Sequence, residues 1–169
     1  MGKKVLIVED EPELLAMMAD AFRKAGIEVF TAGNGEVALE LFNTVQPDLV
    51  ITDIVMPAKE GVALIMDIKR TGSDAPVIAI SGGGTRACKD YLRWAKELGA
   101  ALVLQKPFRM SILLMMARFL MEKAAAAAGS RPGQSRPVPN RPSPPADLAD
   151  LLEDLFDEPL GMGASFNPV

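Results

Sequence analysis

The most informative absence is histidine, because the chain of 169 residues contains none. Without it the protein has no His-based metal site, no histidine general base and no phosphohistidine of its own. A single cysteine, Cys88, excludes a disulfide framework and a cysteine-rich metal cluster. We therefore expect the chemistry of this chain to rest on carboxylates, hydroxyls and lysines.

Excess basic charge and long apolar runs are also lacking. The 18 Lys and Arg residues against 22 Asp and Glu residues give a net charge of −4, which disfavours charge-driven nucleic-acid binding. No apolar run approaches the roughly 20 residues that span a membrane. The N-terminus enters a short apolar run that stops at Glu9, which is too short for a signal peptide. We expect a cytoplasmic protein that binds neither nucleic acid nor a membrane.

A change of composition after residue 123 predicts the end of a folded domain. Residues 124–145 begin with an alanine run and are then rich in proline and arginine, which predicts an extended linker. Residues 146–158 are acidic, and Pro159 ends that segment. We expect residues 159–169 to form a disordered tail.

The acidic segment 146–158 has the pattern of a short amphipathic helix. Its apolar side chains recur at the spacing of one helix face, at Leu148, Leu151, Leu152, Leu155 and Phe156. A helix of about 12 residues is marginal alone in water, so we expect it to dock. Its target is either a downstream partner protein or the folded domain of this chain. The alternative is a mostly disordered tail that keeps the protein soluble.

Short β-branched runs alternate with helical patterns through the first 123 residues. The expected strands are Lys4–Val8, Glu28–Thr31, Asp48–Thr52, Pro76–Ile80 and Ala101–Leu104. The expected helices begin with one that Pro12 opens and Gly26 closes, and continue with Gly35–Thr44, Gly61–Arg70, Arg86–Leu98 and Met110–Ala127. Five βα units predict a doubly wound α/β domain with one parallel sheet and helices on both faces.

Polar residues stand where these strands end: Glu9 and Asp10, Asp53, Ser81 and Lys106. They should converge, because ligands of open α/β sheets bind at the carboxyl ends of the strands. Three neighbouring carboxylates repel one another unless a cation lies among them, and oxygen ligands suit Mg²⁺. The hydroxyl and the ammonium could then bind phosphoryl oxygens. Asp53 is placed to act as the nucleophile that forms an aspartyl-phosphate, a step that needs no general base.

The sequence resembles the receiver domain of bacterial two-component response regulators over about residues 1–123. The resemblance lies in the segments VLIVEDEPELL (5–15), PDLVITDIVMPAKEG (47–61), PVIAISGGG (76–84) and LGAALVLQKPF (98–108). It implies a flavodoxin-like sheet of strand order 2-1-3-4-5. It also implies a phosphorylation-dependent signalling switch rather than an enzyme, with a histidine kinase or a phosphotransfer protein as the phosphoryl donor.

The resemblance assigns roles to individual residues. Asp53 matches the phosphoacceptor, and the Mg²⁺ ligands would be Glu9, Asp10, Asp53 and the main-chain carbonyl of Val55. Ser81 and Lys106 would contact the phosphoryl group. Met56, Pro57 and Gly61 match the turn after Asp53, and Pro107 would follow a cis peptide bond. Output would then pass through protein–protein contacts.

Two departures from the family pattern are visible. Val103 occupies the position where the family often has a switch tyrosine or phenylalanine, so the usual hydroxyl–aromatic coupling cannot operate unchanged. Val55 and Gly83 occupy positions whose side chains can orient water for dephosphorylation, and neither can form such a hydrogen bond. We therefore expect hydrolysis of the aspartyl-phosphate that is not especially fast.

Two other interpretations of the sequence compete with this one. A phosphatase of the haloacid-dehalogenase type also uses an aspartate nucleophile, but it needs a second aspartate where this chain has Val55. The other alternative is a scaffold or adaptor with a vestigial receiver, acting through its acidic C-terminal helix. The intact acidic cluster together with Lys106 argues against a vestigial site.

Overall fold

The computed structural model describes residues 2–54, 56, 61–82 and 96–129. Its elements are β1 (Lys4–Val8), α1 (Pro12–Lys24), β2 (Glu28–Ala32), α2 (Gly35–Val45), β3 (Leu49–Asp53), α3 (Gly61–Arg70), β4 (Val77–Ser81), β5 (Leu102–Gln105) and α5 (Met110–Gly129). Most of the predicted helix 86–98, and all of the predicted acidic helix 146–158, lie outside the described residues.

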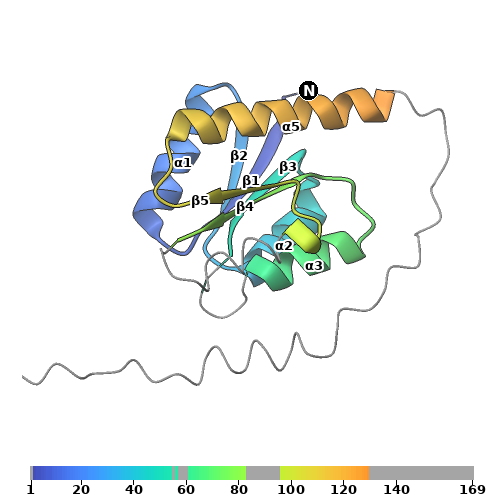
Figure 1. Cartoon of the computed structure of the whole chain (residues 1–169), viewed down its shortest axis with the longest axis horizontal. Coiled ribbons are helices and arrows are strands. Elements are labelled where there is room, and N and C mark those ends of the chain that lie inside the picture. Colours follow the sequence, from blue (N-terminus) through green and yellow to red (C-terminus); the bar gives the residue numbers. More distant parts are fainter. Residues whose placement is uncertain (1, 55, 57–60, 83–95, 130–169) are drawn as a thin grey trace, which may run out of the picture. The chain divides into compact units, whose positions relative to one another are not determined.

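The five strands form one parallel sheet in the order β2-β1-β3-β4-β5 (Figure 1). Helices α1 and α5 cover one face of the sheet, and α2 and α3 cover the other (Figure 1). Burial on both faces explains why the strands are continuous apolar runs rather than alternating ones. This is the flavodoxin-like architecture that the resemblance implied.

The core consists of two apolar layers, one on each side of the sheet. Along β1, Val5 and Ile7 pack with Met18 and Phe22 of α1 and with α5. The intervening Leu6 and Val8 pack with α2 and α3. Successive strand side chains point to opposite faces, so each strand contributes to both layers. The sheet is thereby fixed between the helices, and its carboxyl edge is a rigid place for a functional site.

Strands β3, β4 and β5 each begin and end one residue later than predicted. At the start of β3 the reason is Asp48, whose carboxylate accepts a hydrogen bond from the main-chain N–H of Lys4 at 2.8 Å. It also accepts one from the Lys3 ammonium at 3.3 Å, so Asp48 links strands instead of starting one. The shift makes Asp53 and Ser81 the last residues of β3 and β4.

The helix ends agree with the sequence signals in α1, and α5 ends within two residues of its predicted end. Pro12 is the first residue of α1, and Gly26 follows its end with a φ of 79°. Helix α5 continues through the alanine run to Gly129, two residues past the predicted end at Ala127. Alanine has the highest helix propensity, which explains why the helix continues through this run. None of the helices in the described ranges is long and apolar enough to cross a membrane.

Candidate functional site

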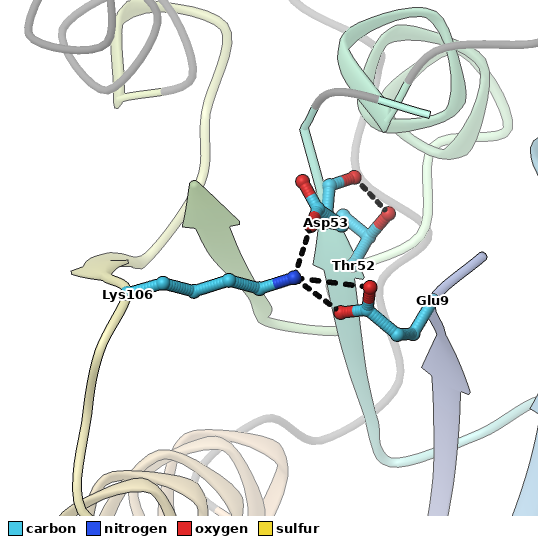
Figure 2. Close-up of polar contacts among 4 residues, drawn as sticks. All are labelled: Glu9, Thr52, Asp53 and Lys106. Carbon is cyan, nitrogen blue, oxygen red and sulfur yellow. Dashed lines mark hydrogen bonds and ion pairs between the residues drawn. The ribbon is translucent and has the colours of Figure 1, made fainter. Parts of the chain in front are cut away.

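Two predicted carboxylates and the predicted lysine meet at the carboxyl edge of the sheet. Glu9 follows β1, Asp53 ends β3 and Lys106 follows β5 (Figure 2). The Lys106 ammonium lies 3.0 and 2.9 Å from the two carboxylate oxygens of Glu9 and 2.5 Å from Oδ2 of Asp53. One cation therefore bridges two carboxylates that come from different strands.

Asp10 completes an acidic cluster with Glu9 and Asp53. One carboxylate oxygen from each of the three lies within 4.8 Å of the others. Glu9 and Asp53 are buried, with 1% and 5% of their surface exposed, whereas Asp10 faces solvent. An all-oxygen set that is open on one side fits Mg²⁺, which keeps several waters and takes few carboxylates. The fourth expected ligand, the carbonyl of Val55, lies outside the described residues.

Burial and charge shift the pKa values of Glu9 and Lys106. Burial raises the pKa of Glu9 above its usual 4.5, against the hydrogen bond from Lys106, and the nearby charge of Asp53 raises it further. For Lys106, burial by itself lowers the pKa, but hydrogen bonds to Asp53 and Glu9 outweigh it and leave the pKa above 10.5. Lys106 is therefore cationic near neutral pH and compensates the carboxylates.

Main-chain hydrogen bonds fix these residues to neighbouring strands. The N–H of Glu9 donates to the carbonyl of Ala32 at 3.1 Å, and the N–H of Lys106 donates to the carbonyl of Ser81 at 2.8 Å. Ser81 is itself fully buried at the end of β4. The peptide bond between Lys106 and Pro107 is cis, as the resemblance implied. All the predicted residues described in this region lie along the same sheet edge.

Val103, the residue at the expected aromatic position, lies in the middle of β5. It pairs with Ala79 of β4, is half-buried and packs against the apolar layer on the α2–α3 side. A branched aliphatic side chain thus fills this place. How Val103 affects switching stays a prediction.

The structure adds one residue to the site and a new contact for another. The hydroxyl of buried Thr52 donates to the main-chain carbonyl of Asp53 at 2.8 Å (Figure 2). A Cβ atom at Gly61 would overlap that same carbonyl oxygen. The sequence offered one signal for Thr52, a polar residue in an otherwise apolar strand. It assigned Gly61 only to a turn, because its approach to Asp53 depends on how α3 packs.

Comparison with known proteins agrees with this geometry. The family model described as the response regulator receiver domain matches residues 5–118, which is most of the folded part. The chain belongs to this receiver family. Receiver domains are signalling switches of two-component and phosphorelay systems, and the sheet order found here is theirs.

Several curated relatives and solved structures are similar to this receiver. The chemotaxis protein CheY of Thermotoga maritima is 38% identical over 112 residues, covering 66% of this chain and 91% of that protein. Sporulation initiation phosphotransferase F of Bacillus subtilis is 32% identical over 108 residues, covering 64% and 85%. The receiver domain of the Francisella response regulator 1452 superposes with a TM-score of 0.66 at 25% identity, covering 72% and 98%.

Longer relatives match only in part. The transcriptional regulatory protein PrrA of Mycobacterium leprae is 32% identical over 127 residues, but the match spans 53% of that protein's length. The chain thus spans about half the length of this curated relative.

Proposed function

We propose that this receiver accepts a phosphoryl group on Asp53 from a phosphohistidine of a histidine kinase or phosphotransfer protein. The observation that carries the proposal is the contact of the Lys106 ammonium with both Asp53 and Glu9 inside the acidic cluster. A half-buried cation next to a candidate nucleophile and an oxygen-ligand cluster is what phosphoryl transfer requires.

The chain's residues account for each part of the transfer. A carboxylate oxygen of Asp53 attacks phosphorus, a P–O bond forms, and the P–N bond breaks as the donor imidazole leaves with the electron pair. The Lys106 ammonium and the Ser81 hydroxyl contact phosphoryl oxygens. Glu9, Asp10 and Asp53 would hold Mg²⁺, which when bound supplies further positive charge to those oxygens. No proton has to be removed from Asp53, in keeping with the absence of histidine.

Output would pass from the phosphorylated receiver to other proteins by direct contact. The acidic segment 146–158 remains our candidate for binding a downstream partner, and its residues lie outside those described. The Val103 position predicts that the response of the β5 region to phosphorylation differs from that of receivers with an aromatic residue there.

Intact mass spectrometry after incubation with Mg²⁺ and acetyl phosphate tests the proposal. We expect one added phosphoryl group on the wild type, and none on Asp53→Asn or in the presence of a chelator. Asp20→Asn is a matched control, because Asp20 is an exposed α1 residue paired with Lys24. Absence of the adduct with this donor and with a phosphohistidine donor would instead favour the scaffold alternative.

A further inference from the structure

The peptide unit that follows Asp53 is held by more contacts than the strand ladder requires. Its N–H, from Ile54, donates to the carbonyl of Ile80 in β4 at 2.8 Å. Its carbonyl, from Asp53, accepts the Thr52 hydroxyl at 2.8 Å (Figure 2). Both ends of one peptide group are therefore fixed immediately beside the candidate nucleophile.

Gly61, the first residue of α3, packs directly against the same peptide unit. Its N–H donates to the carbonyl of Ile54 at 3.0 Å. A Cβ at this position would overlap the Asp53 carbonyl oxygen and lie 2.8 Å from the Asp53 carbonyl carbon and 2.9 Å from Cα of Ile54. Any side chain at this position must push α3 away from β3 or rotate the peptide group after Asp53.

Thr52 has no role in the transfer chemistry itself. Its hydroxyl is bonded to the main chain and is fully buried. A local side-chain hydrogen bond to the adjacent carbonyl is not needed to form a strand, and it competes with ordinary ladder bonding. Thr52 lies near the end of β3, one residue before Asp53. From this position its hydrogen bond restrains the orientation of Asp53.

We infer that Thr52 and Gly61 are positioning residues that set the direction of the Asp53 carboxylate through its main chain. The carbonyl and the side chain of Asp53 share one Cα, so rotating the peptide group tilts the carboxylate away from Lys106. A displacement of about 1 Å in a reacting group can cost up to about a hundredfold in rate. The inference rests on the proposed phosphoryl transfer to Asp53.

The test compares Thr52→Val, Thr52→Ser and Gly61→Ala in the full chain. Valine matches threonine in shape and removes only the donor, so we expect the rate constant for phosphorylation by acetyl phosphate at saturating Mg²⁺ to fall about fivefold. Serine keeps the donor and should restore the rate to within about twofold. Gly61→Ala should lower the rate by about tenfold or more.

Matched controls and a stability measurement separate positioning from folding. Thr44→Val removes a similar hydroxyl-to-carbonyl bond in α2, and Gly33→Ala places a Cβ with nothing within 4 Å, so neither should change the rate. Gly61→Ala also strains the fold, so a loss of rate in that variant does not by itself distinguish positioning from folding. Thr52→Val is therefore the variant that tests the inference. A wild-type rate in Thr52→Val, with or without a change in urea midpoint, would overturn the inference. A wild type that accepts no phosphoryl group would overturn the proposed function, and with it this inference.

Discussion

Among single residues, Lys106 decides the charge balance of the site, because its ammonium contacts both buried carboxylates. Lys106→Met retains much of the side-chain length and leaves Glu9 and Asp53 facing each other without the cation. We expect the free energy of unfolding to fall by about 2–4 kcal/mol in the presence of a chelator, with Mg²⁺ recovering part of this loss. Urea unfolding with and without Mg²⁺ measures both quantities.

The control for this prediction is an ion pair outside the site. Lys24 pairs with Asp20 on the exposed surface of α1, so Lys24→Met should change the free energy of unfolding by about 0.5 kcal/mol or less. If Lys106→Met lost the same stability with Mg²⁺ as with chelator, charge compensation would not be the reason for its effect.

The raised pKa of Glu9 gives a pH dependence with a definite sign. Between the usual value of 4.5 and the raised value in the folded protein, the folded state binds more protons than the unfolded state. The contribution of Glu9 to stability is therefore fully present below 4.5 and is lost as the pH rises through the raised value. We expect Glu9→Gln to remove this decline and to stabilise the protein near neutral pH in chelator. Urea midpoints across this range, compared with wild type, measure the difference; parallel curves would contradict it.

Residue types at strand ends made most of the site predictable. Glu9, Asp53 and Lys106 are charged residues within two positions of the end of an apolar run, and the topology of a parallel sheet brings such ends together. Thr52 and Gly61 could not be assigned in this way, because their contacts are with the main chain of Asp53 and depend on local geometry. Residues that act through the chemistry of their side chains can be recognised from residue type and position. Residues that support the main chain of a neighbour are much harder to recognise in the sequence.

At the scale of whole elements, the contribution of a helix cap to the free energy of unfolding can be measured at the N-cap of α2. The side-chain oxygen of Asn34 accepts hydrogen bonds from the N–H groups of Glu36 and Val37, both at 3.0 Å. We expect Asn34→Ala to lower the free energy of unfolding by about 1 kcal/mol. Asn43→Ala, at an exposed position within the same helix, should be neutral or slightly stabilising. Thermal unfolding compares the two variants, and equal shifts would rule out capping as the cause.

Element types were predictable here, but their ends and their outer faces were less so. The shift of β3 by one residue follows from the contacts of Asp48 with Lys3 and Lys4, which are far from it in sequence. In α5, apolar residues occur on both sides of the helix. Leu113 is buried, whereas Met115 and Phe119 are 60% and 59% exposed. Hydrophobic periodicity cannot select the inner face when both faces are apolar.

At the scale of the whole molecule, a ligand that binds only the folded receiver stabilises all of it. Mg²⁺ at about ten times its dissociation constant should raise the free energy of unfolding by about 1.4 kcal/mol. Asp10 is the residue that tests this most directly, because it is the exposed member of the cluster. Its carboxylate needs no compensation from the protein, so Asp10→Asn should change stability in chelator by only about 0.5 kcal/mol or less.

The same substitution should remove most of the Mg²⁺-dependent gain, since it takes one of three carboxylates from the ion. The exposed Asp20→Asn should retain the full gain. Urea unfolding at increasing Mg²⁺ concentration gives both the gain and the dissociation constant. A full gain in Asp10→Asn would mean that the ion binds elsewhere on the receiver. If Asp10→Asn loses the Mg²⁺-dependent rise in the free energy of unfolding but keeps its stability in chelator, the ion binds at the carboxyl edge of the sheet.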